Sequence, residues 1–175
     1  MHFKTVNMSD KRYDTIYSRI QQSYPNACVL YIDEVVNEYL LGSYTELRER
    51  LQKITKIEEE QLFHGTSDSL INVIAEDGFD PTKNKSAAYG YGTYFAKNAN
   101  YSFNYMRSEK GKDVTYMFLA DVLVGRMTIG KRRTPDDIYD WENNVDNFVR
   151  PTIFTTPYHN GAYPRYIIAF HKNAK

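Results

Sequence analysis

The pattern of hydrophobic and polar positions predicts helices mainly in the first half of the chain and strands mainly in the second. Where apolar side chains recur every three or four residues, the spacing indicates amphipathic helices. Ser9 is the expected N-cap of the first helix, and Gly42-Ser43 is a potential break in the second. Helices are expected over residues 10–23, 33–54, 70–78 and 99–106.

Short apolar runs and one long alternating run predict the strands. The long run, residues 114–124, is rich in β-branched and aromatic side chains, and a polar insertion over 130–147 separates it from the last strands. Because helices precede strands, an α+β fold with an antiparallel sheet is favoured over a doubly wound parallel one. Strands are expected over residues 27–32, 58–64, 93–96, 114–124, 126–129, 152–156 and 166–170.

Composition adds bounds on the size of the fold and on its partners. A chain of 175 residues is long enough for one domain with its own core. Lys and Arg together number 22, as do Asp and Glu, so no net charge attracts the protein to nucleic acid or to an acidic membrane surface. Any polyanion has to be recognised locally.

Cysteine usage and hydropathy predict an intracellular protein. Cys28 is the only cysteine, which excludes an internal disulfide and a zinc cluster built on cysteines, and it favours a reducing compartment. The N-terminus lacks the apolar core of a signal peptide, and no run approaches the ~20 apolar residues of a membrane span. We therefore expect a cytoplasmic or nuclear protein that is not bound to a membrane.

Several generic chemistries lack their signatures. The four histidines do not occur in a His-x-x-x-His or His-x-Glu arrangement, so metal catalysis lacks its usual ligands and no metal is expected. The glycines of residues 90–92 do not form a Gly-x-Gly-x-x-Gly fingerprint followed by a helix, and a P-loop is missing. An NAD-dependent oxidoreductase of the doubly wound type is therefore not indicated.

One His and two aromatic residues form a candidate nicotinamide pocket. His64 follows an apolar pair, and an imidazole there can bond a ribose hydroxyl, while the backbone of Gly65 can pair with a carboxamide. The alternative is a core or turn histidine without a ligand. Tyr94 and Tyr105 are flanked by small residues, and two phenol rings can sandwich a nicotinamide. The chain has sixteen tyrosines, a total that codon bias also explains, so we give weight only to clustered ones.

The motifs LFHGTS, AAYGYGTYFAKNANYS and AYPRYIIAF together resemble the catalytic domain of the poly(ADP-ribose) polymerase family. These enzymes are diphtheria-toxin-like ADP-ribosyltransferases, and the order and spacing of the motifs are similar to the small mono-ADP-ribosylating branch. The resemblance covers residues 27–170. It implies an ADP-ribosyltransferase fold with two packed, mainly antiparallel β-sheets and peripheral helices. Residues 27–175 would be the catalytic domain, and residues 1–26 a helical N-terminal extension.

The resemblance also implies a role for each matched residue. His64 would bond the adenine-side ribose of NAD, the backbone of Gly65 and the hydroxyl of Ser102 would bond the nicotinamide amide, and Tyr94 and Tyr105 would bracket the ring. The loop over residues 80–86 would lie over the dinucleotide. The full set assigned to NAD binding is His64, Gly65, Thr66, Tyr94, Phe95, Ala96, Ser102 and Tyr105.

The third catalytic position indicates what kind of transfer occurs. It falls on Ile153, where chain-elongating members carry glutamate, and the catalytic set would be His64, Tyr94 and Ile153. Isoleucine has no group that accepts a proton, so it cannot activate a ribose hydroxyl as the next acceptor. Tyr101 occupies the place of a lysine of elongating members, which agrees with transfer of a single unit.

The implied function is mono-ADP-ribosyl transfer from NAD, with release of nicotinamide, to Glu or Asp of a protein or of the chain itself. Because only some sixty residues precede His64, no regulatory helical domain is expected before the core. Two alternatives stay open: a weakly active module that binds NAD or ADP-ribose, and an RNA-directed enzyme that either ADP-ribosylates a terminal phosphate or acts as a 2′-phosphotransferase. The phosphotransferase would need several basic residues, for which Lys131-Arg132-Arg133 is a candidate, although a solvated loop is the simpler interpretation.

Overall fold

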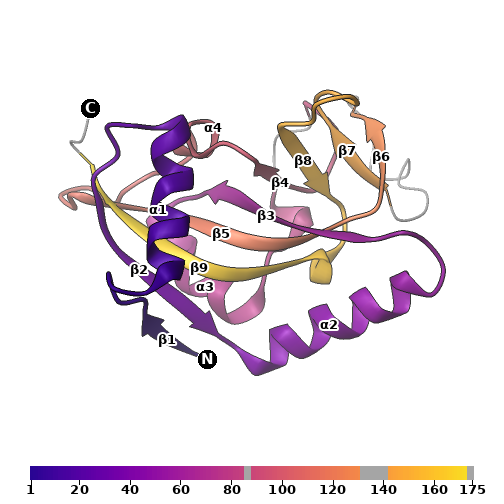
Figure 1. The fold of residues 1–175 in the computed structure, drawn as a ribbon, viewed down its shortest axis with the longest axis horizontal. Helices are drawn as coiled ribbons and strands as arrows, with labels where there is room; N and C mark the ends of the chain where they lie inside the picture. The colour runs from indigo at the N-terminus through magenta and orange to yellow at the C-terminus, as the bar shows by residue number, and fades with distance from the viewer. Residues whose placement is uncertain (85–87, 131–141, 173–175) are drawn as a thin grey trace.

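The fold is one large, mostly antiparallel sheet with four α-helices around it (Figure 1). The structure is a computed structural model that describes residues 1–84, 88–130 and 142–172. The described strands are β1 His2–Thr5, β2 Val29–Val36, β3 Glu58–Gly65, β4 Thr93–Ala96, β5 Val114–Val124, β6 Arg126–Ile129, β7 Glu142–Val145, β8 Ile153–Thr156 and β9 Ala162–His171. The helices are α1 Lys11–Ser23, α2 Glu38–Gln52, α3 Ile71–Asp77 and α4 Ala99–Phe103, with 3-10 turns η1 Asp68–Leu70, η2 Pro81–Lys83 and η4 His159–Gly161.

The mixed, mainly antiparallel architecture is confirmed, with β6 and β7 as the parallel pair. Hydrogen bonds join the described strands in the single order β1-β2-β9-β5-β3-β4-β8-β7-β6, so this pattern does not confirm two separate sheets. The link between β3 and β4 is a single pair, Phe63 with Ala96. In Figure 1, β4, β8, β7 and β6 stand together at one end of the molecule, away from β1 and β2.

Local hydrogen bonds explain where the helices differ from the sequence-based expectations. The first helix is capped by Asp10, whose carboxylate accepts the N–H of Arg12 at 2.8 Å, and not by Ser9. The strand β2 continues to Val36, so α2 begins only after Asn37. Gly42 does not break α2, because the exposed helix surface leaves that position without strain.

Two strands were not expected. β1 pairs antiparallel with β2 ahead of α1, and it extends the sheet at one edge. β7 lies in the polar insertion, where alternation is hidden because Asn143 is fully buried and its side chain donates to the carbonyl of Leu123 at 3.3 Å. The basic cluster of residues 131–133 lies outside the described residues.

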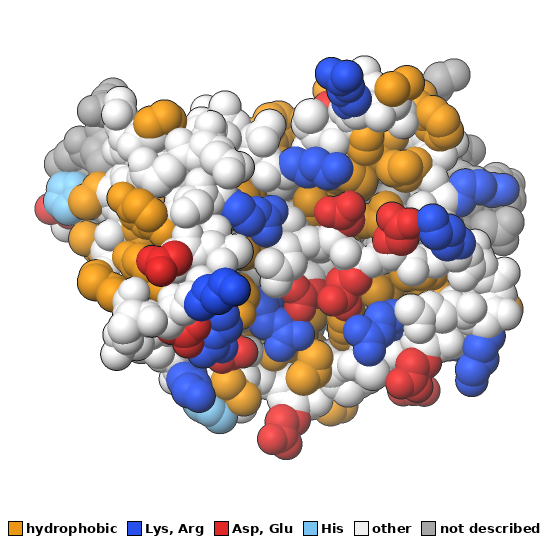
Figure 2. All heavy atoms as spheres, in the orientation of Figure 1, with side chains coloured by type: hydrophobic (Ala, Val, Ile, Leu, Met, Phe, Trp, Pro, Cys, Tyr) orange, Lys and Arg blue, Asp and Glu red, His pale blue; other side chains and the backbone are white. Residues whose placement is uncertain are grey.

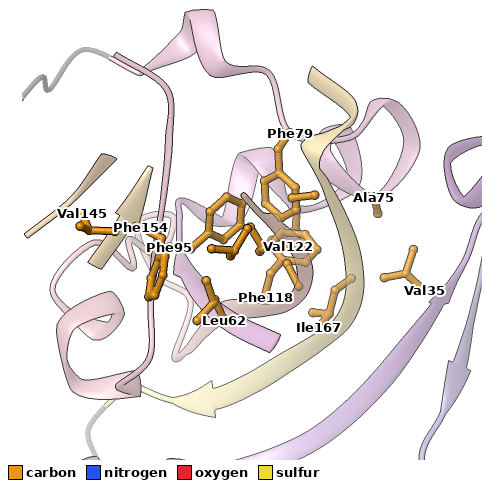
Figure 3. Packing of buried hydrophobic residues seen from close by; sticks show 14 residues of the cluster. Val35, Leu62, Ala75, Phe79, Phe95, Phe118, Val122, Val145, Phe154 and Ile167 are labelled. Atoms are coloured by element: carbon orange, nitrogen blue, oxygen red, sulfur yellow. The ribbon is translucent and has the colours of Figure 1, made fainter. Parts of the chain in front are cut away.

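The sheet and its helices enclose three apolar clusters, one of which packs α2 against β5 and β9 through Leu40, Tyr44, Leu51, Leu123 and Tyr163. Figure 3 shows the cluster beside α3, in which the Phe79 ring packs edge-on against Phe95 and Phe118, with centroids 5.1 and 5.6 Å apart. Another cluster, which includes Ile20 and Phe63, lies under α1 and α4. Acidic and basic side chains are interspersed on the face seen in Figure 2. None of the helices in the described ranges is long and apolar enough to cross a membrane.

Candidate active site

Three neighbouring strands bring His64, Tyr94 and Ile153 into one region, although they are far apart in the sequence. His64 lies near the end of β3, Tyr94 on β4, and Ile153 at the start of β8. Tyr94 is opposite Thr155 and Ile153 is opposite Ala96, so these four side chains share one face of the β4–β8 pair. The structure therefore brings together the residues that the sequence assigned to one site.

His64 is held in one tautomer. Its Nδ1 lies 2.8 Å from the carbonyl oxygen of Tyr94, and because a carbonyl only accepts, Nδ1 must carry the hydrogen. The ring also packs against Phe79 and Phe95, with centroids 5.1 and 5.5 Å away. Burial lowers the pKa of His64, and the bond to Tyr94 opposes this shift. The neutral ring has Nε2 left as an acceptor for a hydroxyl hydrogen.

The phenol of Tyr94 fixes the glycine-rich turn before β4. It accepts the N–H of Tyr89 at 2.9 Å and donates to the carbonyl of Gly90 at 2.6 Å. The rings of Tyr89 and Tyr94 are tilted, with centroids 6.4 Å apart. Burial raises the pKa of Tyr94, so the phenol stays protonated near neutral pH. Tyr94 can therefore offer its ring to a ligand while its hydroxyl holds the turn.

Helix α4 and the residues after it supply the second aromatic element. The hydroxyl of Tyr105 lies 3.0 Å from that of Tyr101, and their rings are 5.3 Å apart at 47°. Burial, followed by the bond to Tyr105, raises the pKa of Tyr101. Because Tyr105 is 48% exposed, its ring can contact a ligand while Tyr101 fixes its orientation.

Gly65 and Ser102 join β3 to α4 by close backbone contact. A Cβ at Gly65 would overlap the carbonyl oxygen of Ser102, so the glycine is needed for the approach of α4. The expected pairing of the Gly65 backbone with the nicotinamide amide stays a prediction. The buried hydroxyl of Ser102 donates to the carbonyl of Phe63 at 3.0 Å, which leaves its oxygen as an acceptor for an amide N–H.

The third assigned catalytic position, Ile153 at the start of β8, carries no carboxylate. Ile153 is 6% exposed, and its N–H donates to Asp146 at 2.9 Å. Asp146 also accepts from the backbone and the hydroxyl of Thr152, at 2.8 and 2.6 Å. These bonds fix the start of β8 and direct the Asp146 carboxylate to the turn.

The remaining assigned residues are buried and pack behind the site on its core side. Phe95 and Ala96 are 1% exposed, and Phe95 packs against His64 from the core. Thr66 is buried, and its carbonyl accepts the N–H of Arg107 at 3.2 Å. Sequence reasoning missed Phe79 and Tyr89 as partners of His64 and Tyr94. The only signal for Tyr89 was its place in the motif that contains Tyr94.

The expected donor loop is described in part. Asp80 caps the turn η2 by accepting the N–H and hydroxyl of Thr82, and the side chain of Asn84 donates to the carbonyl of Gly92 at 2.7 Å. Residues 85–87 lie outside the described residues, so the position of the loop over a dinucleotide stays a prediction. In the described part of the chain, no three His, Cys, Asp or Glu side chains gather in a way that could hold a metal ion.

Comparison with known proteins gives a consistent result. A family model described as the poly(ADP-ribose) polymerase catalytic domain matches residues 11–140. Human "Protein mono-ADP-ribosyltransferase PARP14" is 33% identical over 94% of this chain and 10% of its own length. The mouse protein mono-ADP-ribosyltransferase PARP12 is 30% identical over 98% of this chain and 26% of its own length. The human protein mono-ADP-ribosyltransferase PARP11 is 29% identical over 80% of this chain and 50% of its own length. The chain thus spans between a tenth and a half of these relatives.

Proposed function

The chain belongs to the poly(ADP-ribose) polymerase catalytic-domain family, and from this premise we propose that it transfers a single ADP-ribose unit from NAD to an acceptor. The relatives named above are called mono-ADP-ribosyltransferases, which supports this activity. The observation that carries the proposal is the convergence of His64, Tyr94 and Ile153 on adjacent strands, with an aliphatic side chain at the third position.

In the proposed reaction, the bond between the nicotinamide nitrogen and C1′ of its ribose breaks. The electron pair goes to the ring nitrogen, so nicotinamide leaves as a neutral molecule and positive charge develops on the ribose. Nε2 of His64 accepts a hydrogen bond from a hydroxyl of the adenine-side ribose. The rings of Tyr94 and Tyr105 bracket the nicotinamide, and the Ser102 oxygen accepts a hydrogen bond from its amide. These groups hold the donor in a reactive geometry, and such positioning contributes a large part of catalysis in transfer reactions.

The acceptor itself provides the carboxylate that is missing at Ile153. A carboxylate of Glu or Asp, on another protein or on the chain itself, is already a nucleophile at neutral pH and needs no base. Its oxygen bonds to C1′ as nicotinamide departs, and its negative charge stabilises the positive ribose. A sugar hydroxyl would need a base to lose its proton, so the product is not extended.

The same test distinguishes two other functions. A binding module would hold NAD without releasing nicotinamide, whereas an enzyme directed to RNA ends would label RNA in preference to protein. The orientation of His64 by Tyr94 favours a working donor site over an inactive module. Recognition of RNA would fall on residues 131–133, which are outside the described residues.

Incubation with NAD labelled in its adenylate half, with nicotinamide measured in parallel, tests the proposal. We expect label on protein and an equivalent release of nicotinamide. His64→Ala should reduce both at least about 100-fold, because the ribose loses the acceptor that positions it. The matched control is His2→Ala, which removes an exposed histidine from edge strand β1 and should leave both rates unchanged. Undiminished labelling by His64→Ala, with its fold confirmed by circular dichroism, would contradict the assignment.

A further inference from the structure

The turn between β7 and β8, residues 146–152, presents two large apolar side chains to solvent. Phe148 is 59% exposed and Val149 is 84% exposed, and both lie outside the apolar clusters of the core. Isolated apolar residues are common on protein surfaces, whereas adjoining ones indicate a binding surface. Figure 2 shows hydrophobic side chains, with basic ones beside them, gathered over this end of the molecule.

Hydrogen bonds hold the backbone of this turn in one shape. The side-chain oxygen of Asn147 accepts the N–H groups of Val149 and Arg150 at 2.9 and 3.0 Å. At the other end of the turn, Asp146 accepts from the backbone and the hydroxyl of Thr152 and from the first N–H of β8. The apolar side chains therefore stand on a formed turn, and a partner that contacts them does not have to order the loop first.

The turn leads directly into the third assigned catalytic position. Ile153 follows it as the first residue of β8, and β8 pairs with β4, which carries Tyr94. In the proposed reaction, the carboxylate of the acceptor replaces the one that is missing at Ile153, so it approaches C1′ near the start of β8. A protein segment that delivers its carboxylate to this place passes close to the turn.

Two exposed basic side chains lie near the start of β8. Arg150 belongs to the turn, and Lys97, at the end of β4, donates its backbone N–H to the carbonyl of Thr152 at 2.9 Å. The ion pairs found in the described part of the chain involve neither of these cations. The acid of the turn, Asp146, is bonded to Thr152 and to the backbone. Both cations are thus available to attract an acidic segment.

We propose that the turn over residues 146–152 docks the acceptor, an acidic protein segment with an apolar side chain next to the Glu or Asp that is modified. Phe148 and Val149 contact the apolar side chain, while Arg150 and Lys97 attract the acidic segment. The inference rests on the proposed transfer to Glu or Asp, and it adds a preference for the residues around the acceptor. Because aromatic side chains commonly contribute most to the binding energy of an interface, Phe148 should contribute most here.

Binding of a peptide to the whole chain tests the docking surface without any turnover of NAD. The probe is a short synthetic peptide with one Glu between two leucines, titrated into isotope-labelled chain and followed by the amide resonances of Phe148 and Val149. We expect saturable shifts of these resonances, and binding about tenfold weaker when serines replace the two leucines. Equal binding of the two peptides, or the absence of a saturable shift in the turn, would overturn the proposal.

Variants of the turn assign the binding to particular side chains. Phe148→Ser should weaken binding of the leucine peptide about tenfold. Arg150→Gln should weaken binding of this peptide but not of its counterpart with Gln in place of Glu, because only an attraction between charges is lost. The matched control is Tyr39→Ser, which removes an exposed aromatic ring from α2 and should leave binding unchanged. Equal losses for Tyr39→Ser and Phe148→Ser would contradict docking at the turn.

Steady-state kinetics with the same peptide connects docking to transfer. Phe148→Ser should raise the KM for the peptide about tenfold and leave the KM for NAD as it is, since the variant loses contacts with the acceptor alone. An increase in the KM for NAD without one for the peptide would place Phe148 at the donor site and overturn the proposal. A wild-type chain that binds the peptide at the turn but releases no nicotinamide would contradict the proposed function and support the docking surface.

Discussion

His64 combines two properties that a donor-site histidine needs: a fixed tautomer and a neutral ring. The carbonyl of Tyr94 sets the tautomer, and burial against Phe79 and Phe95 keeps the ring uncharged. Neither property follows from the sequence, which identifies the histidine but not the group that its Nδ1 meets. The motif predicted the residue, and tertiary packing determined its protonation.

The lowered pKa of His64 predicts how stability depends on pH. In the unfolded chain His64 gains its proton near pH 6.5, whereas in the folded protein it does so only at lower pH. As pH falls below 6.5, the unfolded state binds more protons, so the free energy of unfolding decreases by up to ~1.4 kcal/mol per pH unit until the folded-state pKa is reached. Urea unfolding at a series of pH values measures this slope.

His64→Asn provides the comparison for that slope. Other titrating groups are common to both proteins, so the difference between the two slopes isolates His64. The slope of the variant should be smaller between pH 6.5 and the folded-state pKa. Identical slopes would mean that His64 titrates normally and is not desolvated.

At the scale of elements, the junction of β3 with α4 determines the shape of the site. Gly65→Ala places a methyl group against the carbonyl of Ser102, which must push α4 away. We expect a loss of ~1–3 kcal/mol in the free energy of unfolding and a marked loss of NAD turnover. Denaturant unfolding and nicotinamide release measure the two effects.

Gly42→Ala is the matched control for that substitution. A Cβ at Gly42 meets nothing within 4 Å, and the residue lies inside α2. The change should therefore stabilise the protein by ~0.5–1 kcal/mol and leave turnover unaffected. If Gly65→Ala behaved in the same way, the proposed contact between β3 and α4 would be wrong.

Asn37 links the helices α2 and α3, and its loss gives a second prediction at the scale of elements. Its side chain caps α2 by accepting from Leu40 at 3.2 Å, and it donates to the carbonyls of Ala75 and Glu76 at 3.0 Å each. Asn37→Ala should cost about 2 kcal/mol, because the cap is lost and buried carbonyls lose their donor. Thermal or urea unfolding measures the loss. Asn72→Ala, at an exposed position of α3, should change stability by less than ~0.5 kcal/mol.

The sequence predicted elements best where periodicity and burial agree. The strands β4 and β5 have the predicted boundaries, and most of their side chains are buried. β6 also has the predicted boundaries, although none of its side chains is fully buried. β1 was missed because all its side chains are exposed, and it exists through backbone pairing with β2. β7 was missed because Asn143 is buried through hydrogen bonds that no hydrophobic pattern reveals.

At the scale of the molecule, the order of strands assembles the site. β3, β4 and β8 are neighbours, although some ninety residues separate His64 from Ile153 in the sequence. Local patterns cannot predict such an order. The resemblance to a family assigned the three residues to one site but did not give the order of the strands. The single pair between β3 and β4 leaves the sheet weakly joined where the site lies.

The mass of the modified product tests the central claim most directly. The chain is incubated with NAD and a Glu-rich protein acceptor, and modified peptides are analysed by mass spectrometry. Because Ile153 offers no base to activate a ribose hydroxyl, each modified carboxylate should carry one ADP-ribose unit, with one nicotinamide released per unit. A ladder of products with two or more units at one site, or release of nicotinamide by a fully active His64→Ala variant, would contradict this account.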